Sequence, residues 1–74
     1  NPATSSVMIF IAPSFHNNVR MTITDVNGKV VYWQDNLQPA VSYGLDTHTL
    51  SNGTYFIVLA DSKETATKRL VISR

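Results

Sequence analysis

The chain contains no cysteine, so neither a disulfide framework nor a thiolate metal site can stabilise it. It also has little excess charge, because six Lys and Arg residues oppose five Asp and Glu and leave a net charge of +1. This balance gives no field that draws the domain to nucleic acid or anionic lipid, so no nucleic-acid partner is expected. The longest apolar run, Tyr55 to Ala60, is about a third of the length that a membrane-spanning helix needs.

The 74 residues suffice for one domain, 1–74, and not for two. The apolar fraction of 43% is ordinary for a folded chain and too high for a disordered one. The first six residues are polar and lack the basic and apolar parts of a secretory signal peptide. Because the chain starts with Asn1 and has no initiating methionine, it is interpreted as a piece of something longer.

Alternation of apolar and polar residues predicts strands along most of the chain, and no apolar set recurs at helical spacing. Turn residues separate the predicted strands at intervals of about 8–12 residues, which is typical of an antiparallel sandwich. The fold class is therefore all-β, an Ig-like sandwich of about seven short strands. The segment Gln34 to Ala40 is predicted to be a connection. The predicted strands are Val7–Ala12, Val19–Val26, Lys29–Trp33, Val41–Leu45, Thr54–Ala60 and Thr65–Ser73.

The dipeptide Asn27-Gly28 predicts a two-residue hairpin turn of type I′, in which both residues have positive φ. Such a loop pairs Ile23 with Tyr32 and places Val30 and Tyr32 on the inner face. A second motif, Leu50 to Tyr55, resembles the tyrosine corner of Ig-like sandwiches, where the hydroxyl bonds to upstream backbone. The predicted core consists of Ile9, Ile11, Met21, Ile23, Val30, Tyr32, Leu50, Tyr55, Ile57, Leu59, Leu70 and Ile72.

Candidate catalytic residues are few. His16 and His48 lie in polar segments far apart in the sequence and are interpreted as solvated, and a zinc site needs three or four ligands. Asp25, Asp35 and Asp46 do not form the Asp-x-Asp-x-Asp ladder of a calcium loop, and Asp25 is better explained as a turn residue that binds backbone amides. No nucleophile elbow is present. We therefore expect no enzyme activity, no metal and no cofactor.

The strongest strand is apolar on both faces, because Phe56 and Val58 oppose the predicted inner face. This second face, together with Trp33, is either covered by loops that carry Phe10 or Phe15 or is a docking surface.

The basic residues near the C-terminus also allow two interpretations. They either form a recognised strand end or protect an edge strand from aggregation.

Four short motifs occur in order along the chain. They are Asn1-Pro2-Ala3, the alternating strand and Gly turn of residues 19–31, the Leu-x-x-Gly-x-Tyr-Phe segment of residues 50–58, and the basic residues leading into an apolar strand at 67–72. Together they cover nearly the whole chain, which resembles the type IX secretion C-terminal sorting domain (type A, Por secretion family). The chain departs from that pattern in lacking the leading proline of the first motif and an upstream linker.

The resemblance implies a delivery signal attached to an N-terminal cargo domain. Its partners are then the outer-membrane translocon and a sortase-like peptidase that removes the domain at the surface. The route leads through the periplasm to the outer membrane surface or the extracellular space. The implied recognition residues are Lys68, Arg69, Leu70, Val71, Ile72, Ser73 and Arg74. The motif and turn residues are Asp25, Asn27, Gly28, Lys29, Gly53 and Tyr55.

The alternative function is an Ig-like or fibronectin-III-like accessory module that spaces domains or binds carbohydrate or protein, because it shares the sandwich and the tyrosine corner. A toxin or inhibitor is disfavoured by the missing cysteines. Open strand edges also predict a homodimer at high concentration, swapped through Gln34 to Ala40.

Overall fold

The fold is that of a computed structural model, which describes residues 2–3 and 6–73. All regular structure in these residues is β-strand, so the all-β prediction is confirmed. The strands are β1 (Pro2–Ala3), β2 (Ser6–Phe10), β3 (Val19–Asp25), β4 (Val30–Leu37), β5 (Ser42–Asp46), β6 (Gly53–Ala60) and β7 (Thr65–Ile72).

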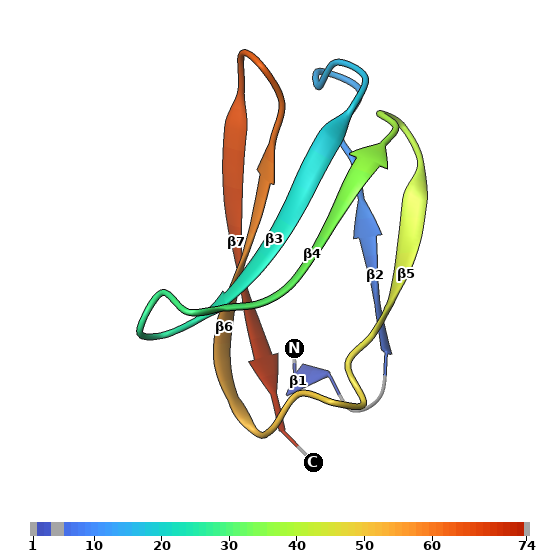
Figure 1. Cartoon of the computed structure of the whole chain (residues 1–74). Coiled ribbons are helices and arrows are strands. Elements are labelled where there is room, and N and C mark those ends of the chain that lie inside the picture. Colours follow the sequence, from blue (N-terminus) through green and yellow to red (C-terminus); the bar gives the residue numbers. More distant parts are fainter. Residues whose placement is uncertain (1, 4–5, 74) are drawn as a thin grey trace.

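The strands form two sheets packed face to face (Figure 1). One sheet has the order β1-β7-β6-β3-β4, and the other contains β2 and β5. Every pairing is antiparallel except that of β1 with β7, which is parallel. Six strands thus build the antiparallel sandwich, slightly fewer than the seven expected, and the two-residue β1 extends one edge of it.

The core lies between the two sheets and confirms most of the predicted inner positions. The inward residues of β6, Tyr55, Ile57 and Leu59, are at most 6% exposed, so the predicted face of this strand is correct. The other confirmed core residues are Ile11, Met21, Ile23, Leu70 and Ile72. Two more, Ile9 and Leu50, are partly buried against the core. The core also contains Phe15, Val19, Leu37 and Leu45, which were not among the predicted core residues.

The β3–β4 turn differs from the prediction. Among the described residues, Gly28 has a positive φ of 83° but Asn27 does not have a positive φ, so the type I′ turn is wrong. The N–H of Gly28 donates to the carbonyl of Asp25 at 3.1 Å, and the N–H of Asp25 donates to the carbonyl of Lys29 at 3.0 Å. This pattern is a three-residue loop, a type I turn followed by a left-handed glycine. The Asp25 carboxylate stabilises it by accepting from the N–H groups of Asn27 and Lys29.

Replacing Gly28 with valine is expected to lower the free energy of unfolding by about 1–2 kcal/mol, because a β-branched residue is strained at this φ. A Cβ at this position meets nothing within 4 Å, so the loss is purely a backbone effect. The control, Asn27→Ala, should change the free energy by less than about 0.5 kcal/mol, because Asn27 is exposed and needs no positive φ. Thermal melts of both variants test the turn, and a larger effect at Asn27 than at Gly28 contradicts it.

One register shift and the lack of a covering sheet explain why the inner face of β4 was predicted wrongly. Ile23 pairs with Tyr32 as expected, but Thr24 pairs with Val30, so Val31 is an extra residue in a bulge. Val30 and Tyr32 are 50% and 39% exposed and are not core residues. The β3–β4 loop projects away from β2 and β5, so no second sheet covers this end of the hairpin (Figure 1).

The segment that was predicted to be a connection is half strand, because β4 continues to Leu37. Asn36 has a positive φ of 61°, and the register shifts by one residue along this part of the strand. The shift turns Leu37 inward, where it pairs with Val19 and is 1% exposed. A strand exchange could therefore use only the shorter loop that follows Leu37, and the homodimer itself stays a prediction.

Candidate functional site

The C-terminal strand β7 contains most of the residues that were predicted to be recognised. Leu70 and Ile72 are buried, with exposures of 5% and 1%, and Val71 is half-buried. Lys68, Arg69 and Ser73 are exposed, and Arg74 lies outside the described residues. The strand thus combines two apolar anchors with exposed basic side chains at its middle.

One edge of β7 is largely open. Along its other edge β7 pairs with β6 over its full length, from Thr65 to Ile72. On the open edge it pairs only with β1, through Val71 and Ile72. Within residues 2–3 and 6–73, the edge between Thr65 and Leu70 therefore has no partner strand. Unpaired edge groups are a ready template for another strand.

A groove of ≈ 570 Å³ lies between β7 and β2. Its walls are mainly apolar, and its basic residues are Lys68 and Arg69. In the described part of the chain neither of these two side chains forms an ion pair or hydrogen bond. The lining residues are Val7, Met8, Ile9, Phe10, Ala12, Ile57, Leu59, Lys68, Arg69 and Leu70. Sequence reasoning missed the β2 side of this groove, because only the tertiary structure brings β2 beside β7.

The motif and turn residues converge at a second place. Asp25 on β3 pairs directly with Tyr55 on β6, and both line a cleft of ≈ 310 Å³ together with Lys29 and Gly53. Asn27 and Gly28 belong to the same turn but do not line the cleft. Residues from two separate motifs thus meet at one end of the sheet.

The tyrosine corner is confirmed. The Tyr55 hydroxyl donates to the carbonyl of Ser51 at 2.8 Å, while the ring itself is only 6% exposed. Gly53 between them has a φ of 153°, a conformation that residues with a side chain rarely adopt. The geometry of the corner therefore accounts for the presence of Tyr55 and Gly53 in the motif. The hydrogen bonds within the β3–β4 turn account for Asp25.

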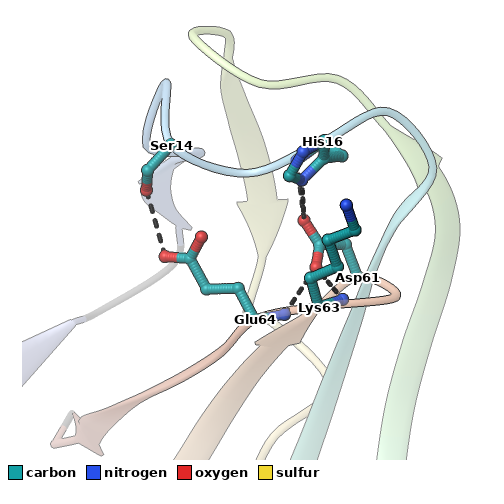
Figure 2. A network of polar contacts seen from close by, with 5 residues as sticks. All are labelled: Ser14, His16, Asp61, Lys63 and Glu64. Atoms are coloured by element: carbon teal, nitrogen blue, oxygen red, sulfur yellow. Dashed lines mark hydrogen bonds and ion pairs between the residues drawn. The ribbon is translucent and has the colours of Figure 1, made fainter.

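A network of polar contacts connects the loop before β3, which contains Ser14 and His16, to the turn between β6 and β7 (Figure 2). One oxygen of Asp61 accepts from the N–H of His16 at 2.6 Å and lies 3.3 Å from Nδ1 of that residue. Its other oxygen accepts from the N–H groups of Lys63 and Glu64, both at 2.7 Å. The Ser14 hydroxyl donates to Glu64 at 3.0 Å. The imidazole of His16 is thus exposed, as expected, but it contacts a carboxylate that the sequence did not connect to it.

The side chain of Asp61 has no exposed surface, yet its pKa is lowered to about 2. The N–H of His16 contributes most, followed by that of Lys63, and burial opposes the shift. Hydrogen bonds to the charged form therefore outweigh desolvation. The network stabilises two loops at one end of the sandwich and shows no catalytic arrangement.

Other charged groups of the described residues are structural or isolated. Arg20 forms a bidentate pair with Asp35 at 2.6 and 2.8 Å and lies over the ring of Trp33 at 5.0 Å. This pair raises the pKa of Arg20 and lowers that of Asp35, chiefly through their hydrogen bonds.

No group of three His, Asp or Glu residues that could hold a metal occurs in the part of the chain that the structure describes. That part also contains no helix long and apolar enough to span a membrane.

The outer face of β6 is not covered by loops that carry Phe10 or Phe15. Phe15 lies in the core, and Phe10 belongs to β2 in the other sheet, where it is 56% exposed, so neither residue covers Phe56 or Val58 from a loop. Both residues are nevertheless half-buried among their neighbours in the sheet. Trp33, in the same outward row as Val58, is 57% exposed.

Comparison with known families gives a match to the family described as the secretion system C-terminal sorting domain, over residues 1–73. Comparisons with curated proteins and with solved structures give no match.

Proposed function

Because the chain belongs to the family of secretion system C-terminal sorting domains, we propose that it directs an N-terminal cargo across the outer membrane by type IX secretion. The family match over residues 1–73 is the observation that carries this proposal, and it favours a sorting signal over an accessory spacing module. The cargo is then a secreted protein that passes to the outer membrane or the extracellular space. The family is one of sorting signals and not of enzymes.

Finer steps also belong to the proposal. The cargo crosses the periplasm, the translocon in the outer membrane reads the domain, and a sortase-like peptidase removes it at the surface. The recognised surface is the C-terminal strand β7, with Lys68 and Arg69 as its basic contacts. Two observations support this choice: the two cations have no partner within the described residues, and the neighbouring edge of β7 is open. Backbone pairing gives affinity in strand addition, and alternating side chains give specificity.

The double variant Lys68→Ala with Arg69→Ala separates recognition from folding. Fused to a passenger in a strain competent for type IX secretion, it should reduce surface delivery at least about tenfold, the factor for a loss of about 1.4 kcal/mol of recognition. Circular dichroism should show an intact fold, because both side chains are exposed and make no described polar contact.

Lys63→Ala is the matched control, since it removes an exposed cation from the turn between β6 and β7 and should leave delivery unchanged. Passenger stranded in the periplasm beside a folded double variant supports recognition of this strand. Normal delivery of the double variant contradicts it and moves the recognised surface elsewhere, first to the face of Phe56, Val58 and Trp33.

A further inference from the structure

The groove between β2 and β7 runs along two strand edges and reaches the inner face of β6, where Ile57 and Leu59 line it. Successive side chains of a strand point to opposite faces, so a surface on one face touches only alternate residues. This groove touches four consecutive residues of β2, Val7 to Phe10, and three consecutive residues of β7, Lys68 to Leu70. Because β5 pairs with the other edge of β2, the groove follows the edge of β2 that no described strand occupies.

The hydrogen-bond pattern of β2 shows which amides face the groove. Just beyond the strand, the N–H of Ile11 donates to the carbonyl of Val41 at 3.0 Å. Bonding to one neighbour alternates along an antiparallel strand, so the amides of Ile9 and Val7 also point toward β5. The amides of Met8 and Phe10 consequently point away from β5, toward the open edge of β2. The side chains of Met8 and Phe10 point to the outward face of β2, opposite Val7 and Ile9, and are 67% and 56% exposed.

The positive charge of the groove favours an acidic strand as the one that adds to this edge. Its lining contains Lys68 and Arg69 but no Asp or Glu, and neither cation has an ion-pair partner in the described residues. Lys68 pairs in register with buried Ile57 and so belongs to the inner row, at the side where the sandwich is open. Arg69 pairs with Phe56 and belongs to the opposite row, but its side chain also lines the groove. A carboxylate on an incoming strand therefore meets the uncompensated charge of Lys68 next to an apolar wall, with that of Arg69 at the same strand edge.

We propose that this groove binds an extended acidic peptide of a partner protein, which adds as a strand to the free edge of β2 and places a carboxylate opposite Lys68 and Arg69. The proposal rests on the proposed function for the existence of a partner, and it adds β2 to the surface that the partner reads. Main-chain bonds to Met8 and Phe10 supply affinity, and the basic pair sets the register and the preference for an acidic segment.

The test uses a set of fluorescent seven-residue peptides of alternating valine and threonine, with one glutamate placed at each position in turn. At least one member should bind the 74-residue domain saturably in an anisotropy titration, with a dissociation constant at or below about 1 mM. Exchanging its glutamate for lysine should weaken binding at least about tenfold, because like charges then face each other. In Lys68→Ala with Arg69→Ala, the two peptides should bind within about twofold of each other.

The role of the β2 backbone is tested by Met8→Pro, which removes an N–H that points away from β5. Proline is tolerated at such an edge position, and the loss of one bond should weaken binding about fivefold or more. Met8→Leu, the matched control, keeps the N–H and should bind like the parent. If Met8→Pro does not fold in a thermal melt, the same test is made by methylating alternate backbone amides of the peptide, which should abolish binding.

The absence of saturable binding by every peptide overturns the proposal, as does equal binding of the methylated peptide. Sedimentation that shows a dimer of the parent chain, lost in Met8→Pro, assigns the groove to a second copy and also overturns it. Failure of the proposed function can be told apart from failure of this inference. If the proposed function is wrong, a passenger fused to the parent domain is not delivered, whether or not the peptides bind. Delivery without peptide binding contradicts this inference alone.

Discussion

Replacing Ile23 with alanine is expected to lower the free energy of unfolding by about 2–5 kcal/mol. Ile23 is 0% exposed in the middle of β3, where it pairs with Ile57 on one side and Tyr32 on the other. Removing three carbons there leaves a cavity between two sheets, and the paired strands cannot close over it. A domain of 74 residues has only about 4–11 kcal/mol of total stability, so a large part of it should be lost.

Val30→Ala is the matched control on the neighbouring strand. Val30 was predicted to lie in the core but is 50% exposed, so its truncation should lower the free energy of unfolding by less than about 1 kcal/mol. Urea unfolding followed by circular dichroism measures both variants. Equal losses at the two positions would show that the uncovered end of the β3–β4 hairpin is packed after all.

The Asp61→Asn variant is expected to lower the melting temperature at pH 7 by at least about 5 °C. One oxygen of Asp61 accepts from Lys63 and Glu64, and the other accepts from the N–H of His16. An asparagine can satisfy only one of these sides, because its amide nitrogen donates and so opposes whichever N–H it faces. The loop that carries His16 then loses its connection to the turn between β6 and β7.

The same carboxylate predicts a dependence of stability on pH. Its pKa in the folded domain is about 2, below its ordinary value of 3.8. A depressed pKa contributes stability that is complete above the unfolded pKa and is lost as the pH falls through the folded pKa. The stability difference between the parent and Asp61→Asn should therefore be constant at neutral pH and shrink as the pH falls from about 4 to about 2.

Asp35→Asn is the control for this pH series. Asp35 also binds a cation closely, but the pair with Arg20 is exposed and is screened by salt. Melts at high salt should therefore remove most of the effect of Asp35→Asn and little of that of Asp61→Asn. A difference between the parent and Asp61→Asn that does not change between pH 4 and pH 2 contradicts the lowered pKa.

The sequence predicted those parts of the fold in which alternation is regular. In β6, Tyr55, Ile57 and Leu59 face inward as expected, because a strand paired on both sides has a fixed register. The tyrosine corner was predictable for a similar reason, since its hydroxyl bonds only four residues upstream. Features that depend on contacts local in sequence, or on the period of two, can be inferred without coordinates.

The errors lie where that period is interrupted. A bulge at Val31 and the left-handed Asn36 each shift β4 by one residue, and neither has an unambiguous signature in the sequence. Leu37 is therefore buried, although the turn residues around it predicted a connection. Phe15 enters the core from a loop, which no periodicity describes.

The candidate site was predicted in part. The family motifs identified Lys68 and Arg69, and these residues do line a groove. The other wall, from Val7 to Phe10, lies about 60 residues earlier in the chain, and only the packing of the two sheets brings it there. The contact of His16 with Asp61 spans 45 residues and is equally invisible to a pattern, although the Asp-Ser-Lys-Glu turn could have suggested a carboxylate that binds local amides.

The parallel pairing of β1 with β7 determines how the domain carries tension. When a passenger pulls on Pro2 while Ile72 is held, the force acts along both strands in opposite directions, so the bonds between them are sheared together and are not unzipped one by one. In the described part of the chain, two residue pairs form this contact, and the next strand, β2, is paired on one edge only. Tension from the passenger should therefore release β1 first and β2 second, while β3, β6 and β7 remain assembled.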